Sequence, residues 1–148
     1  TKVTVHSCVM EQTAVEDEGF RYLRLPAPDL SWPPAALIDE FIEFVKSIDM
    51  AQVWLHFHCH AGTGRTGIFM MLYDKLKNPT VSMEDIAIRH VLTGSEYPLY
   101  SSGRISFHGL LNAEKARMMP LLFQYIDENR DSDYAVRWSD WLASRTSQ

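Results

Sequence analysis

Short stretches rich in branched and aromatic residues predict three β-strands in this chain. They cover residues 2–7, 20–25 and 52–58, and the second alternates apolar with polar positions, as half-buried strands do. The third is nearly continuous in apolar character, which is typical of a central strand buried on both faces. The sequence therefore predicts a small sheet with residues 52–58 at its centre.

Longer stretches repeat apolar residues every three or four positions, which predicts helices. Pro33 and Pro34 mark the start of one of them, because proline suits the first helical turn. Ser82, with Asp85 three residues later, resembles a capping box that opens another. Pro120 should kink or split the longest, since it removes a helical hydrogen bond. The expected helices are 11–18 (a polar helix or turn), 33–48, 66–77, 82–92, 106–130 and 138–142, with a loop at 97–103. Strands followed by several helices predict a single α/β domain over residues 1–148, with a small central sheet flanked by helices.

Composition narrows the function classes. A net charge of -5 over 148 residues argues against a nucleic-acid-binding protein. No apolar stretch approaches the ~20 residues that a membrane helix needs, and no signal peptide is visible. Cys8 and Cys59 are too few for a disulfide framework. We therefore expect neither nucleic-acid nor membrane partners.

The segment after the third predicted strand carries the candidate chemistry. Cys59 and Arg65 enclose His60, Ala61, Gly62, Thr63 and Gly64, and residues 59–65 are called the Cys59 loop below. Successive N–H groups in a tight turn before a helix can hold an anion, and Gly62 and Gly64 permit backbone conformations that a β-carbon would forbid. Arg65 can grip two phosphate oxygens. The same surroundings should lower the pKa of the Cys59 thiol, with Thr66 placed to support the thiolate.

Other interpretations of these residues exist. A buried cysteine is usually a small apolar residue, and glycines after a strand usually mark only a turn. His56, His58 and His60 alternate, a spacing that occurs in metal sites. However, a metal at Cys59 would leave the glycines and Arg65 unexplained, so we expect neither a metal nor a cofactor. The four tryptophans, Trp32, Trp54, Trp138 and Trp141, are expected in the core.

The sequence His58-Cys59, five residues, then Arg65-Thr66 resembles the signature of the protein tyrosine phosphatase superfamily. The flanking residues are similar to those of bacterial protein-tyrosine-phosphatase-like phytases. These flanks are 54–59, 61–66, 76–79, 20–22, Asp29 with Trp32-Pro33, 128–130 and 138–142. The resemblance implies a phosphatase fold, here in a minimal version, and hydrolysis of myo-inositol polyphosphates through a phosphocysteine. It also favours a secreted or periplasmic protein. We expect a monomer whose partner is a small phosphorylated molecule, an inositol polyphosphate.

The resemblance assigns the remaining roles. Asp29 alone would be taken for a turn residue or helix cap, but the family's general acid falls on its position. Lys115 matches a phosphate-contacting lysine of the family, and His108, seven residues earlier on the same predicted helix, is a substitution. A solvated helix surface is the alternative for both. His60 stands where these phytases often carry Glu.

Three functions follow from this sequence. The first is an inositol polyphosphate phosphatase, with Cys59, Arg65, Asp29 and Thr66 as catalytic residues. Its substrate would be held by Lys115, His108 and residues 60–64 of the Cys59 loop. The second is a protein tyrosine or dual-specificity phosphatase, although no aromatic recognition loop is evident. The third is a non-catalytic phosphate-binding module, against which the full set of candidate catalytic residues argues.

Overall fold

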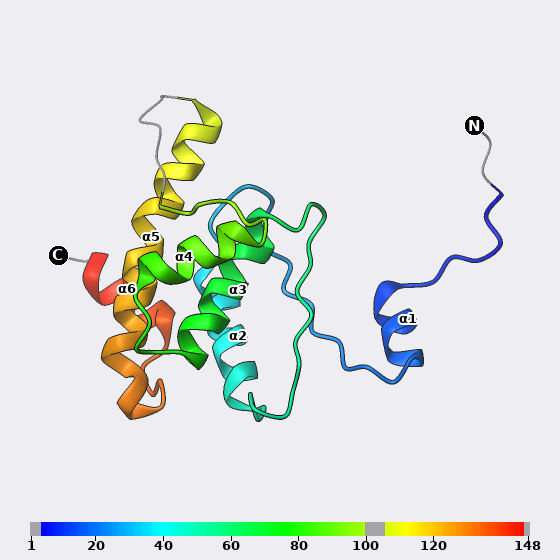
Figure 1. Cartoon of the computed structure of the whole chain (residues 1–148), viewed down its shortest axis with the longest axis horizontal. Helices are drawn as coiled ribbons and strands as arrows, with labels where there is room; N and C mark the ends of the chain where they lie inside the picture. Colours follow the sequence, from blue (N-terminus) through cyan, green and yellow to red (C-terminus); the bar gives the residue numbers. More distant parts are fainter. Residues whose placement is uncertain (1–3, 100–105, 147–148) are drawn as a thin grey trace.

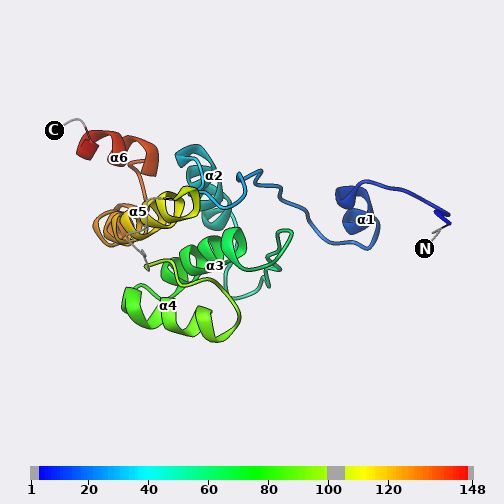
Figure 2. The same ribbon diagram turned by 90° about the horizontal axis from the view of Figure 1, so that it is seen from above.

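A computed structural model describes residues 4–99 and 106–146 of the chain. These residues form six α-helices and one 3-10 helix: α1 (Glu11–Asp17), α2 (Ala35–Lys46), α3 (Gly64–Lys77), α4 (Met83–Leu92), α5 (Phe107–Asn129), η1 (Arg130–Ser132) and α6 (Trp138–Thr146). Helices α2 to α6 pack into one body, with α3 in contact with both α4 and α5, and α6 in contact with α2 and α5 (Figures 1 and 2). The expected helices are therefore present, each with small changes at its ends.

Burial of apolar stripes holds this body together. Ile38 of α2, Leu72 of α3 and Leu122 of α5 are all 0% exposed, and each such side chain stabilises the fold by about 1.5–3 kcal/mol relative to exposure. Ser82 caps α4 by accepting a hydrogen bond from the Asp85 backbone N–H at 3.1 Å, as the sequence suggests. Ser106 caps α5 in the same way, through the N–H of Gly109 at 3.1 Å. The core thus positions α3, the helix that follows the Cys59 loop.

Pro120 does not divide α5, which is one helix over Phe107–Asn129. The proline cannot donate to the carbonyl four residues earlier. It lies on the exposed side of the helix, whereas Met119 and Leu122 beside it are fully buried. Packing of the buried face therefore outweighs the missing hydrogen bond.

The predicted sheet is wrong: residues 4–99 and 106–146 contain helices, turns and extended chain but no β-strand. Residues 20–25 and 53–58 are extended without pairing, Gln52 lies in a turn, and residues 4–7 of the first predicted strand are likewise unpaired. Trp54, expected in the core at the centre of the sheet, is 83% exposed, while the other three tryptophans are buried. Alternation and β-branching indicate an extended chain, but a strand also needs a neighbour for its N–H and C=O groups, which composition does not supply.

Helix α1 lies apart from the other helices and is joined to them by extended chain (Figures 1 and 2). Its Glu11 carboxylate is held by Tyr22 Oη at 2.9 Å and by His58 Nε2 at 3.0 Å. These contacts connect α1 to the extended segment that leads into the Cys59 loop. Of the predicted loop at 97–103, residues 100–103 lie outside the described part of the chain. No helix in residues 4–99 and 106–146 is long and apolar enough to cross a membrane.

Candidate active site

The Cys59 loop runs from the extended segment 53–58 into the first turn of α3. Gly62 has φ +76°, in the left-handed region that glycine enters without cost. Gly64, expected to need similar freedom, is instead the first residue of α3. The turn at Gly62 bends the loop so that its N–H groups and the N-terminus of α3 lie near the Cys59 side chain, an arrangement that favours negative charge.

The Cys59 thiol is the group most affected by this arrangement. The Gly62 N–H donates to Sγ at 3.2 Å. Partial burial raises the pKa of the thiol, but interactions with the Thr66 hydroxyl and with the N–H groups of Thr66, Gly62 and Ala61 lower it more, to about 7. The Thr66 hydroxyl is among the groups that lower the pKa of Cys59, and its Oγ1 is buried without another hydrogen-bond partner among the described residues. Half of the thiol is therefore ionised near neutral pH, as a nucleophile requires.

Arg65 and Asp29, which the sequence places 36 positions apart, meet at the loop. Arg65 Nη2 lies 2.9 Å from Asp29 Oδ1, and Nη1 lies 3.5 Å from the carbonyl oxygen of Ala27. The Arg65 side chain is 25% exposed and that of Asp29 is 70% exposed. The proline-rich segment reaches this position through a left-handed turn at Leu30 (φ +64°). The predicted general acid and the predicted phosphate-binding arginine are thus in direct contact.

The segment after α4 packs against the other side of the loop. A β-carbon on Gly67 would lie 3.0 Å from both Cβ and Oγ of Ser95, so only glycine fits there without displacement. The Glu96 N–H donates to the Thr63 carbonyl at 3.4 Å. Glu96 Oε2 would lie 3.5 Å from a β-carbon on Gly64. Residues 95 and 96 therefore cover the junction between the loop and α3.

The other expected substrate contacts are dispersed. Lys115 is 5% exposed, and its Nζ donates to Glu96 Oε2 at 3.1 Å. His108 is exposed, with its ring centroid 5.7 Å from that of Phe107. His60 and Ala61 are exposed at the loop surface, and Thr63 and Gly64 are half-buried. Lys115 is therefore connected to the loop through Glu96, and no contact between His108 and the loop is described.

Glu96, which lies beside the Cys59 loop, was not predicted from the sequence. It lies in an irregular segment, where periodicity gives no information. A signal was available on α5, however: Lys115 is flanked at helical spacing by Met118, Met119 and Leu122, all buried. A lysine on an apolar face needs a carboxylate partner, so its position predicts an acidic residue packed against α5.

The alternating histidines make ring contacts along the extended segment. The ring centroids of Trp54 and His56 lie 6.0 Å apart and those of His56 and His58 lie 5.7 Å apart, both pairs stacked. His58, the last ring of this row, contacts the Glu11 carboxylate through Nε2. Among residues 4–99 and 106–146, no group of three His, Cys, Asp or Glu side chains is placed to hold a metal ion.

A low-pKa thiol, a cluster of N–H groups and an arginine in one loop are the features expected of a cysteine-containing phosphate-binding site. Residues 1–76 match the model of the PTP-like phytases, a family described by the words "Inositol hexakisphosphate". The chain belongs to this family, as the resemblance predicted.

Solved structures agree in fold. The tandemly repeated protein tyrosine phosphatase-like phytase from Mitsuokella multacida matches 95% of the chain with 42% identity and a TM-score of 0.89. The PTP-like myo-inositol phosphatase from the same organism, in complex with myo-inositol-(1,3,4,5)-tetrakisphosphate, matches 95% with 41% identity and a TM-score of 0.87. A PTP-like phytase from Bdellovibrio bacteriovorus matches 97% with 29% identity and a TM-score of 0.86.

Similar sequences include two bacterial proteins. Effector protein hopD2 of Pseudomonas syringae pv. tomato is 27% identical over 90% of the chain, and AvrBs1.1 of Xanthomonas campestris pv. campestris is 32% identical over 60%. The chain spans 86% of AvrBs1.1 but only 29% of hopD2. It also spans 24% of each Mitsuokella chain and 56% of the Bdellovibrio chain. The matched region thus corresponds to a part of most of these proteins.

Proposed function

We propose that this protein is a phosphoric monoester hydrolase that removes phosphate from myo-inositol polyphosphates through a phosphocysteine intermediate. The observation that carries the proposal is the Cys59 thiol, whose pKa is lowered to about 7 within a loop that also contains Arg65. The inositol tetrakisphosphate bound by the Mitsuokella phosphatase supports the choice of substrate class.

In the first step, the Cys59 thiolate attacks phosphorus and forms an S–P bond as the ester P–O bond breaks. Arg65 and the N–H groups of residues 60–64 stabilise the charge on the phosphoryl oxygens. Protonated Asp29 gives its proton to the leaving oxygen of the inositol ring. Proton transfer of this kind contributes about 10²–10⁴-fold to a rate.

In the second step, water attacks the phosphocysteine and the S–P bond breaks. The Asp29 carboxylate takes a proton from that water, and inorganic phosphate leaves. The Thr66 hydroxyl faces the departing sulfur and supports the thiolate that forms. At the end of this step Cys59 is again a thiolate and Asp29 is again protonated, as at the start of the cycle.

Substrate competes with Asp29 for Arg65. The guanidinium group binds the Asp29 carboxylate at 2.9 Å, and a phosphate that binds the same guanidinium in two-pronged fashion must displace it. Displacement frees the Asp29 carboxylate, which takes up a proton from solvent and can then donate it to the leaving oxygen. His60 and His108 are exposed and remain predicted contacts for the other phosphates of the ring. Lys115, a further predicted contact, is buried against Glu96.

A substrate panel tests the proposal. Phosphate release is measured from inositol hexakisphosphate, inositol tetrakisphosphate, phosphotyrosine peptides and p-nitrophenyl phosphate, with Cys59→Ser as the control. We expect turnover of the inositol phosphates and a loss of at least about 10⁴-fold in the variant. High activity on phosphotyrosine peptides with negligible release from inositol phosphates would favour a protein phosphatase. Unchanged turnover in Cys59→Ser would rule out the phosphocysteine.

A further inference from the structure

Among residues 4–99 and 106–146, two lysines are buried, and each is paired with a carboxylate on another segment. Lys75 of α3 is 4% exposed and Lys115 of α5 is 5% exposed. Burying an ammonium group is costly unless it is paired and hydrogen-bonded. The partners of these lysines therefore indicate what each one does.

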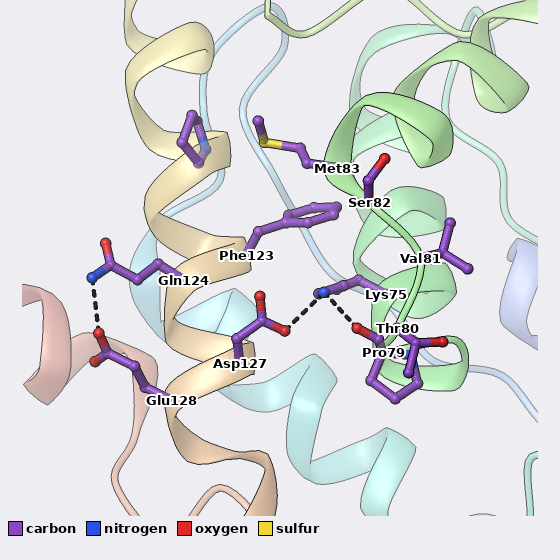
Figure 3. A pocket seen from close by; sticks show the side chains of 11 residues that line it. Lys75, Pro79, Thr80, Val81, Ser82, Met83, Phe123, Gln124, Asp127 and Glu128 are labelled. Carbon is purple, nitrogen blue, oxygen red and sulfur yellow. Dashed lines mark hydrogen bonds and ion pairs between the residues drawn. The ribbon is translucent and has the colours of Figure 1, made fainter.

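The ammonium group of Lys75 has both an ion-pair partner and a hydrogen-bond partner within the helical body (Figure 3). Its Nζ lies 2.8 Å from Asp127 Oδ1 and 2.7 Å from the Pro79 carbonyl oxygen, and 5.6 Å from the centre of the Phe123 ring. These contacts tie the end of α3 to α5 and to the turn before α4. Lys75 therefore has a structural role, because its contacts join three segments of the fold.

Lys115 has a narrower set of contacts. Glu96 Oε2, at 3.1 Å, is the only hydrogen-bond partner that the described residues give it. Glu96 is not on a helix, and its side chain is 49% exposed. The cost of burying Lys115 is therefore offset, among the described residues, by one carboxylate in an irregular segment.

That carboxylate is held against the Cys59 loop. Its Oε2 is 3.5 Å from the position of a β-carbon on Gly64, the first residue of α3. The Glu96 N–H donates to the Thr63 carbonyl, and the preceding Ser95 packs on Gly67. A negative charge at this place competes with phosphate for the N-terminus of α3, where the helix dipole favours an anion.

We propose that Lys115 is a positioning residue that acts on the Cys59 loop through Glu96: it neutralises the Glu96 carboxylate and fixes it beside Gly64, so that the loop binds phosphate instead. The inference rests on the proposed function, in that the loop is taken to bind the substrate's phosphate. It assigns Lys115 an indirect role, in place of the direct substrate contact that the family resemblance predicts.

The test compares four variants: Lys115→Met, Glu96→Gln, the double variant of both, and Lys75→Met as the matched control. The affinity for inorganic phosphate is measured by calorimetry, and the melting temperature is recorded for each. We expect Lys115→Met to weaken phosphate binding about tenfold, because an unpaired charge remains beside the loop. The double variant and Glu96→Gln should each bind within about threefold of the original protein.

Lys75→Met separates a positioning role from a purely structural one. It removes an equally buried lysine from α3, and should lower the melting temperature with less than about twofold change in phosphate affinity. If Lys115→Met lowers the melting temperature and leaves phosphate affinity unchanged, the proposal is wrong. If Lys115→Met does not fold, the phosphate affinity of Glu96→Gln is the deciding measurement. A tenfold loss of phosphate affinity in Glu96→Gln also overturns the proposal.

Two further readouts distinguish direct contact with substrate. If the double variant binds phosphate no better than Lys115→Met, Lys115 touches the anion itself and the proposal fails. A loss of kcat/KM confined to inositol phosphates, with p-nitrophenyl phosphate unaffected, has the same meaning, because a positioning residue affects both. Should the original protein hydrolyse no inositol phosphate while the phosphate affinities come out as expected, the proposed function fails and Lys115 keeps its role.

Discussion

The two ends of α3 use similar side chains for different purposes. At its C-terminal end, Lys75 lines an open pocket of about 530 Å³ between the α3–α4 turn and α5 (Figure 3). Its charge is cancelled within the helical body by Asp127 and the Pro79 carbonyl. At the N-terminal end, about 15 Å away along the axis, Arg65 is paired with Asp29, whose side chain is exposed.

The difference lies in which contacts an incoming anion can replace. Asp29 is 70% exposed, so phosphate can displace it from Arg65 without unfolding anything. The Lys75 side chain is only 5% exposed, against 25% for Arg65, so an incoming anion has far less access to the Lys75 ammonium group. A pocket with a cation is therefore no sign of an anion site, and the N-terminal end of α3 is the end at which to look for function.

Asp29→Asn should give the largest effect that separates the two ends. The variant cannot donate a proton, so kcat for inositol phosphates should fall by about 100-fold or more. Because Arg65 is no longer paired with a carboxylate, inorganic phosphate should bind as tightly as before or more tightly. Steady-state kinetics and calorimetry measure the two quantities.

The leaving group provides the control for this variant. Because p-nitrophenolate departs without a proton, its phosphate ester should lose much less activity in Asp29→Asn than the inositol esters do. Equal losses for both substrates, or weaker phosphate binding, would mean that Asp29 is only a turn residue that holds Arg65 in place.

Gly67→Ala should have an intermediate effect. The new methyl group would meet Ser95 at 3.0 Å and push residues 95 and 96 off the loop. We expect phosphate affinity to fall about fivefold. The melting temperature should change little, since alanine in a helix is favoured over glycine by about 1 kcal/mol and offsets the crowding.

Ser95→Gly supplies the rescue for this variant. It removes both atoms that the new methyl group would approach, so the double variant should recover phosphate affinity. Failure of the rescue, with affinity still reduced, would show that the contact between Gly67 and Ser95 does not position the loop.

Sequence reasoning was most successful where function and local pattern coincide. The helices follow from apolar spacing and caps such as Ser82, and the Cys59 loop follows from residue types that are rarely combined for any other reason. The prediction of a sheet was wrong because strand pairing depends on a neighbouring strand. Trp54, expected at the centre of that sheet, lies on an unpaired segment and is 83% exposed. Glu96 was missed for a related reason: its importance lies in a contact with Lys115, 19 positions away, that no local pattern encodes.

Titration of Cys59 should give the smallest shift, and it tests the N-terminal end of α3 most directly. In a variant with Cys8→Ser, the rate of alkylation by iodoacetamide should rise with pH and reach half its plateau near pH 7, the pKa set by the loop. A free cysteine titrates near about pH 8.5. Thr66→Val removes the hydroxyl that faces the sulfur, so its midpoint should move upward by about half a pH unit or more.

The sign of the linked stability follows from the same shift. Because folding lowers the pKa of Cys59, its contribution to stability is fully present above the unfolded pKa and is lost as the pH falls through about 7. Thiolate formation and the fold of the loop therefore support each other. A midpoint at 8.5 or above in the original protein, or an unchanged midpoint in Thr66→Val, would show that the loop does not prepare Cys59 for attack. In that case the N-terminal end of α3 would differ from the Lys75 end only in exposure.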